Sequence, residues 1–107
     1  MVSIDRLAEV CKLAGDKTRL TILAYLKEQE CCVCDLAELL QTSQPNVSQH
    51  MRKLKDGGLV KETRKGQWIY YSLEIGDMPY LQELLEHLPS QKEKLDEIKA
   101  GCANRCE

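Results

Sequence analysis

The stretch SQPNVSQHMRKLKDGG, residues 43–58, has the pattern of an amphipathic helix with marked ends. Ser43 or Gln44 is suited to cap the start, and the proline that follows is tolerated in a first turn, where its missing N–H has no intrahelical partner. The two glycines end the pattern. At the 3.6-residue period of a helix, one face is apolar and carries Val47, Met51 and Leu54. The opposite face is polar and basic, and it carries Ser48, Gln49, Arg52 and Lys53. The stretch predicts a helix with one buried face.

The segments on either side predict a helix-turn-helix followed by a hairpin. A shorter helix is expected from about Val33 or Asp35 to Gln41, and Thr42-Ser43 separates it from the next helix. Ala37 supplies the small side chain that a close helix crossing needs. Residues 59–64 and 67–73 are β-branched or aromatic runs joined through Lys65-Gly66, which predicts a two-stranded wing.

Helical spacing marks three more segments. The first covers residues 3–14, and the second covers residues 17–27 with Asp16 as its cap. The third runs from Tyr80 to about Lys99, and Pro89 within it either kinks or divides it. The predicted fold is mainly α with a β-hairpin wing, a winged helix-turn-helix in the order α-α-α-α-β-β-α. It occupies residues 1–100, and residues 101–107 form a Cys-containing tail. Because the first and last helices carry more apolar surface than one copy can bury, a homodimer through them is favoured over a monomer whose core they cover.

Charge is unevenly distributed along the chain. The 107 residues carry a net charge of −2, yet residues 43–73 hold six basic and two acidic side chains, a local balance of +4. Local charge governs phosphate contact, so double-stranded DNA is the expected partner of this segment. Amide and hydroxyl groups suit base edges in the major groove, and basic groups suit phosphates. The expected contacts are Gln44, Asn46, Ser48 and Gln49 to bases, and Arg52, Lys53, Arg64 and Lys65 to phosphates.

Composition narrows the function class further. No apolar run approaches the roughly 20 residues of a membrane helix, and the N-terminus lacks a signal-peptide pattern, so a cytoplasmic protein without a membrane partner is expected. Six cysteines in such a chain indicate reduced, catalytic or metal-binding thiols rather than a disulfide framework. An enzyme is not expected, because the local spacing is Cys-x-Cys and neither Cys-x-x-Cys nor a phosphate-cradling loop is present. An architectural DNA protein without a ligand would leave the cysteines unexplained.

Several motifs in the right order resemble the winged-helix repressors of the ArsR/SmtB family. They are Asp16–Leu20, Ser43–Met51 followed by Leu54, Gly58-Leu59-Val60, and Gly66–Leu73, and the match covers about residues 5–75. The resemblance implies a homodimeric transcriptional repressor that leaves its operator when an inducer binds.

The run Cys31-Cys32-Val33-Cys34-Asp35 is similar to the inducer site of the arsenite-responsive branch, which uses thiolates at the second and third of these cysteines and a nearby third thiolate. The implied inducer is arsenite, As(III), and also Sb(III), since thiolates prefer soft ions. Joint use of Cys32 and Cys34 needs extended or frayed backbone at the helix start, because side chains at i and i+2 lie on nearly opposite sides of a helix. Position 37 is Ala, where a third cysteine can occur, so the third donor stays open between Cys31 and the tail pair Cys102 and Cys106.

Alternatives within the same family are a repressor that responds to cadmium, lead or zinc through four thiolates, and a thiol-redox repressor. The tail cysteines could also form a second site, a reversible disulfide or no site. Cys11 is expected to be a buried small hydrophobe, and His50 to pack or contact phosphate rather than bind metal. A zinc site on the last helix is not expected, because only His87 is available there, with Asp77 and Glu83 nearby.

Overall fold

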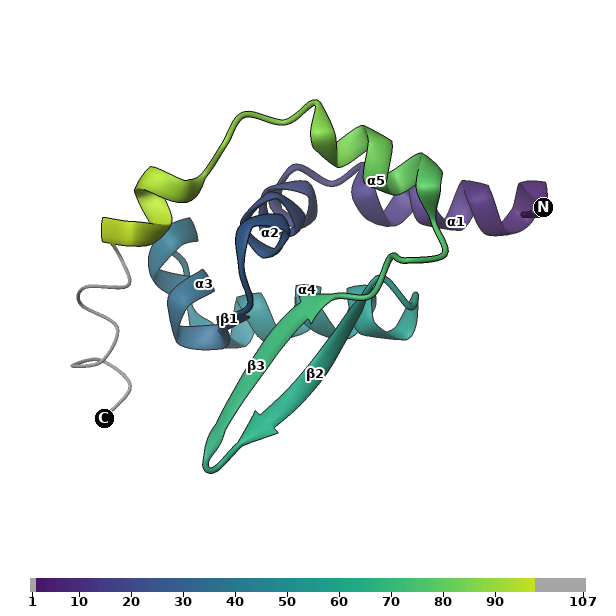
Figure 1. Cartoon of the computed structure of the whole chain (residues 1–107). Helices are drawn as coiled ribbons and strands as arrows, with labels where there is room; N and C mark the ends of the chain where they lie inside the picture. Colours follow the sequence, from purple (N-terminus) through teal and green to yellow (C-terminus); the bar gives the residue numbers. More distant parts are fainter. Residues whose placement is uncertain (1, 98–107) are drawn as a thin grey trace.

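The computed structural model describes residues 2–97 and confirms the winged helix-turn-helix fold (Figure 1). The elements, in chain order, are α1 Ile4–Ala14, α2 Lys17–Glu28, β1 Cys31–Cys32, α3 Val33–Leu40, α4 Gln44–Asp56, β2 Val60–Lys65, β3 Trp68–Leu73 and α5 Pro79–Glu86. Residues 92–97 are helical again. The β2–β3 hairpin projects from the helical body as a wing. None of the described helices combines the length and the apolar character needed to cross a membrane.

The helix-turn-helix consists of α3 and α4. Ser43 is the N-cap of α4, and its hydroxyl accepts a hydrogen bond from the Asn46 N–H at 3.2 Å. The turn between the helices is made at Gln41, which has a positive φ of 52°, and the Thr42 N–H donates to the Ala37 carbonyl at 3.0 Å. Asp16 caps α2 in the same way as Ser43 caps α4, with its carboxylate 3.0 Å from the Arg19 N–H. The predicted caps of both helices are therefore confirmed.

The sheet has three strands in the order β1-β3-β2, one more than the sequence predicted. The wing strands pair antiparallel from Val60 opposite Leu73 to Lys65 opposite Trp68, and Gly66 turns the chain with a φ of 64°. The extra strand is β1, whose Cys32 lies opposite Tyr70. The cysteine run is thus joined directly to the wing.

The core lies between the helices and the base of the sheet. The predicted buried face of α4 is confirmed, since Val47, Met51 and Leu54 are all fully buried. They join a cluster with residues of the other helices, among them Leu36 of α3 and Leu23 of α2. This packing fixes α4 with its polar face outward.

The last predicted helix, 80–99, is wrong in extent. The first part, α5, ends at Glu86 with His87 as its C-cap, and Pro89 lies in the break, so the proline divides the helix rather than kinks it. The physical reason is a competing contact: the Glu28 carboxylate accepts hydrogen bonds from the Gln91 N–H at 2.8 Å and the Ser90 hydroxyl at 3.0 Å. The chain then forms the short helix of residues 92–97, and its Leu95 enters the core.

Candidate functional site

Cys32, Cys34 and Asp35 form a compact group of possible metal ligands. One ligand atom from each lies within 4.8 Å of the others. Their convergence follows from the local fold: Cys32 has extended backbone, with φ −86° and ψ 168°, and is the N-cap of α3, while the other two lie in the first turn of that helix. Binding of one ion by the sulfur atoms of both Cys32 and Cys34 requires extended backbone at the helix start, and the structure has it at Cys32.

The same three residues make the cap of α3. The Asp35 N–H donates to the Cys32 Sγ at 3.4 Å, and the Cys32 N–H donates to Asp35 Oδ2 at 3.4 Å, a capping box in which cysteine takes the usual place of serine. The other carboxylate oxygen, Oδ1, is buried and has no hydrogen-bond partner among the described residues. The donors therefore comprise two sulfur atoms and one carboxylate oxygen, a set that fits a thiophilic ion. Asp35 was missed as a candidate ligand.

The remaining cysteines differ in their surroundings. Cys31 is fully buried, and its thiol donates to the Gln29 carbonyl at 3.6 Å, so its sulfur is not part of the group described above. Cys11 is exposed in the single chain, contrary to the burial expected from its apolar neighbours, because it lies off the face of α1 that packs on the core. Cys34 is disulfide-bonded in this structure, so it serves as a thiolate only after reduction. Cys102 and Cys106 lie outside the described residues.

The residues expected to contact DNA are spread over α4 and the tip of the wing. Six of them lie on the exposed side of α4 and two at the hairpin tip: Gln44, Asn46, Ser48, Gln49, Arg52, Lys53, Arg64 and Lys65. Lys65 forms an ion pair with Glu30, the residue before β1, and its ammonium lies 5.0 Å from the Tyr70 ring centroid. His50 is half-buried, and its Nδ1 has no hydrogen-bond partner among the described residues.

A polar contact links the wing to α4. Glu62 of β2 accepts hydrogen bonds from Lys55 at 3.0 Å and from the Tyr71 hydroxyl at 3.1 Å. Both hydrogen bonds, the Lys55 bond first, hold the pKa of Glu62 below its usual value, while burial and the Glu62 contact raise the pKa of Tyr71. Tyr71 lies opposite Cys31 of β1, so this contact joins the cysteine strand, the wing and the reading helix.

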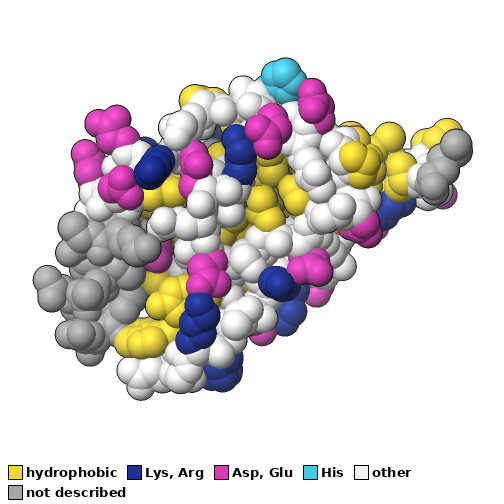
Figure 2. All heavy atoms as spheres, viewed as in Figure 1, with side chains coloured by type: hydrophobic (Ala, Val, Ile, Leu, Met, Phe, Trp, Pro, Cys, Tyr) yellow, Lys and Arg dark blue, Asp and Glu magenta, His cyan; other side chains and the backbone are white. Residues whose placement is uncertain are grey.

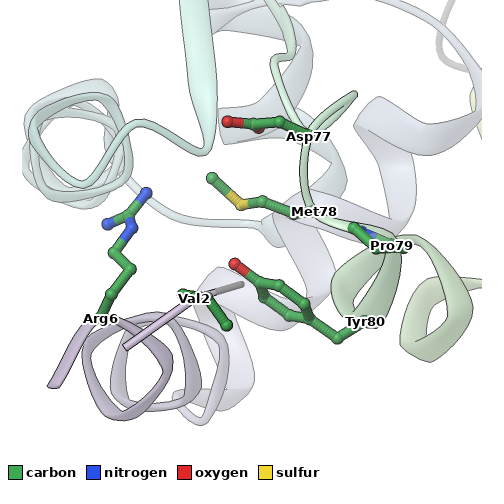
Figure 3. Close-up of a pocket in the computed structure, with 6 residues that line it drawn as sticks. All are labelled: Val2, Arg6, Asp77, Met78, Pro79 and Tyr80. Carbon is green, nitrogen blue, oxygen red and sulfur yellow. The ribbon is translucent and has the colours of Figure 1, made fainter. Parts of the chain in front are cut away.

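Two hollows differ in their relation to the cysteines. One, of about 300 Å³, is lined by residues of the start of α3, the start of α4 and the wing: Cys32, Val33, Cys34, Gln44, Ser48, Gln67, Trp68 and Ile69. The other, of about 640 Å³, lies between the start of α1 and the segment that leads into α5 (Figure 3), and it is lined by Val2, Arg6, Asp77, Met78, Pro79 and Tyr80. The second hollow shares no residue with the thiol group. His87, the histidine considered for a zinc site, is the exposed C-cap of α5, and its Nε2 atom lies 3.4 Å from Glu83 Oε1.

Comparison with known proteins identifies the family to which this architecture belongs. The family profile described as "Bacterial regulatory protein, arsR family" matches residues 16–62. An arsenical resistance operon repressor from Staphylococcus xylosus is 33% identical over 102 residues, which covers 95% of this chain and 91% of that protein. The chain belongs to the ArsR family. Other relatives of this ArsR-family chain are the arsenic resistance regulator ArsR1 of Pseudomonas putida, 41% identical over 63 residues, and a CadC homolog, a cadmium resistance regulator of Staphylococcus aureus, 39% identical over 80 residues.

Those two alignments cover 59% and 74% of this chain, and 48% and 64% of the respective relatives.

Solved structures of other proteins share the fold of this chain. HlyU from Vibrio cholerae superposes with a TM-score of 0.70 at 31% identity, over 76% of this chain and 88% of that chain. A homodimeric winged helix-turn-helix DNA-binding domain from Mycobacterium bovis gives 0.69 at 32% identity, over 80% and 84%. The proteins that this chain resembles are transcriptional regulators.

Proposed function

We propose that the protein is a cytoplasmic, homodimeric repressor that releases its operator DNA when trivalent arsenic, or antimony, binds to Cys32 and Cys34. The observation that carries the proposal is the convergence of these two sulfur atoms in the cap of α3. Thiolates suit such soft ions, and their affinity is expected to rise with pH as the thiols lose protons. A third sulfur donor comes from Cys31, Cys102 or Cys106.

The coupling to DNA follows from the dual role of Cys32. When its sulfur turns toward an ion shared with Cys34, its hydrogen bond from the Asp35 N–H is weakened or broken, so the first turn of α3 loses part or all of this capping bond. Loss of a helix cap costs about 1 kcal/mol. Because α3 supports α4, a cost of that size, at the lower end of the range of about 1–3 kcal/mol for allosteric coupling, is enough for a change in operator affinity of about fivefold. DNA must weaken inducer binding by the same factor.

On the DNA side, we propose that the start of α4 reads base edges in the major groove and that the basic side chains hold phosphates. Gln44, Asn46, Ser48 and Gln49 belong to the first group, and Arg52, Lys53, Arg64 and Lys65 to the second. Two copies joined through α1 and α5 place two such helices on successive half-sites.

The test is release of DNA from the reduced, full-length protein. The operator is first selected from random duplexes, and fluorescence anisotropy then follows its release by arsenite in a phosphine reductant, which does not chelate arsenic as a dithiol does. We expect C32S and C34S to abolish release while C11S, the matched control on α1, leaves it intact. The variants C31S, C102S and C106S identify the third donor. Release from C32S as readily as from the wild type overturns the proposed site.

One specific observation favours a second candidate, a repressor that responds to cadmium, lead or zinc. The third donor among the described residues is the carboxylate of Asp35, and oxygen ligands suit borderline divalent ions better than arsenic. A relative is named a cadmium resistance regulator. The same titration with each ion, and with peroxide for a thiol-redox response, separates the alternatives, and D35N weakens release by a divalent ion only if its oxygen is a ligand.

A further inference from the structure

The larger of the two hollows, between the start of α1 and the segment that leads into α5, has the size and lining of a small-molecule site. Its volume of about 640 Å³ falls within the roughly 300–1,000 Å³ that is usual for such sites. Figure 3 shows the polar ends of Arg6, Asp77 and Tyr80 turned toward the same space. The rest of the lining is apolar and comes from Val2, Met78 and Pro79. The hollow therefore suits a ligand that is partly charged and partly apolar.

The two charged side chains of the hollow have opposite charges, yet they do not pair with each other. Among the residues that the structure describes, Arg6 forms its ion pair with Glu9 through Nη1, and Asp77 forms none. A guanidinium group carries several N–H donors, so Arg6 can bind a ligand carboxylate while Nη1 stays on Glu9. The Glu9 contact is also a weak competitor, because the two side chains are 34% and 57% exposed.

These two charges decide the chemical class of the ligand. A simple carboxylate would be attracted by Arg6 and repelled by Asp77, and a simple amine would meet the reverse. A ligand with both a carboxylate and an ammonium group gives each lining charge a partner. The apolar part of the lining then favours an apolar side chain on that ligand. We propose that the hollow binds a free α-amino acid with an apolar side chain, its carboxylate at Arg6 and its ammonium group at Asp77.

The position of the hollow connects such a ligand with distant parts of the chain. Arg6 belongs to α1, whereas Asp77 lies in the segment between the wing strand β3 and α5. A Cβ atom added to Gly58 would lie 3.4 Å from Arg6 Nη2, so Arg6 also lies beside the junction of α4 and β2. The ligand would join the two helices proposed to form the dimer. The hollow shares no residue with the group of Cys32, Cys34 and Asp35, so this proposal is independent of the inducer site.

Binding is tested by NMR on the reduced, full-length, isotope-labelled protein. The probes are L-leucine and three relatives that each lack one of its groups. These are 4-methylpentanoate without the ammonium group, 3-methylbutylamine without the carboxylate, and glycine without the side chain. We expect leucine to shift the amide signals of Arg6, Asp77 and Tyr80, and to bind about tenfold more tightly than each relative, because each lacks one favourable contact.

Two variants assign the groups of the ligand to the two charged residues. R6Q should weaken leucine binding about tenfold without weakening that of 3-methylbutylamine, and D77N should weaken leucine binding about tenfold without weakening that of 4-methylpentanoate. K12Q on α1 and E86Q on α5 are the matched controls, since both change an exposed charge outside the hollow.

Equal affinity of leucine for R6Q, D77N and the wild type would overturn the proposal. It is also wrong if leucine leaves the amide signals of the hollow unchanged while dilution of the protein shifts them, because a second copy of the chain would then occupy the hollow. Release of the operator by arsenite is measured separately, so failure of this proposal leaves the proposed function standing.

Discussion

Glu62 illustrates how single side chains tie the wing to the reading helix. It accepts hydrogen bonds from Lys55 of α4 and from Tyr71 of β3, and these contacts lower the pKa of its carboxyl group. A carboxyl group with a lowered pKa in the folded state stabilises the protein above its ordinary pKa, and that contribution is lost as pH falls through the lowered value.

Removal of the Tyr71 hydroxyl should therefore destabilise the protein in a pH-dependent manner. We expect Y71F to lower the free energy of unfolding by about 0.5–1 kcal/mol at neutral pH, a modest value because Glu62 is partly exposed. The difference from the wild type should shrink as pH falls through the lowered pKa of Glu62, since a protonated carboxyl group is a weaker acceptor. Urea unfolding across this range measures it, with Y80F as control. A difference that does not change with pH would exclude the ionised Glu62 as its origin.

At the same scale, the sequence was sufficient to pair Cys32 with Cys34, but not to find Asp35. The pair stands out because two soft donors lie two residues apart beside a helix start. The carboxylate was overlooked because a capping box is normally recognised by serine or threonine at its first position, and here Cys32 takes that position. The spacing Cys-x-x-Asp was the available signal.

At the scale of elements, the helices were predictable and two features were not. The strand β1 has only two residues, both cysteine, so it shows no alternation of apolar and polar positions, and its pairing with β3 is a long-range contact. The last helix was predicted too long because its apolar spacing continues through Leu88 to Leu95. The contact of Glu28 with residues 90–91, more than 60 positions away, decides its break.

That contact predicts the local stability of the segment after α5. Replacement of Glu28 by alanine removes the acceptor of the Gln91 N–H and the Ser90 hydroxyl, so the following turn loses its anchor. We expect the Leu95 amide, which donates to the Gln91 carbonyl, to exchange about tenfold faster with deuterium. Amides of α4 should not change. E86A, an exposed change at the end of α5, is the control, and equal exchange in E28A and the wild type would refute the anchoring role.

The ion pair between Lys65 and Glu30 predicts a gain in DNA affinity when it is removed. In the structure without DNA, the Glu30 carboxylate holds an ammonium group that we propose binds phosphate. E30Q should free Lys65 and raise operator affinity about two- to fivefold at low salt, with a steeper dependence on salt concentration. E74Q, which removes the exposed partner of Lys61 at the base of the wing, is the matched control. Anisotropy titrations at several salt concentrations measure both effects, and weaker binding by E30Q would contradict the prediction.

At the scale of the whole molecule, apolar side chains remain exposed on the two helices proposed to form the dimer. The large hydrophobic residues that stay exposed among the described ones are Ile4 and Leu7 of α1, at 85% and 36%, and Leu84 of α5, at 48%. Figure 2 shows hydrophobic side chains gathered toward the N-terminal end of α1. Three exposed residues of this kind on two helices fit an interface between copies better than a monomer surface.

A charged side chain on this exposed apolar face should dissociate the proposed dimer and, as a consequence, weaken its binding to DNA. A carboxylate at position 84 would have to leave water when α5 is covered, so L84E should raise the dimer dissociation constant by about a hundredfold. Operator affinity should fall with it, because one subunit reaches only one half-site. Sedimentation equilibrium and anisotropy measure the two quantities, and K17E, an exposed change on α2, is the control. Since α5 also packs on the core through Leu81 and Leu85, circular dichroism must show that L84E is folded. A folded L84E that remains dimeric at micromolar concentration would place the interface elsewhere.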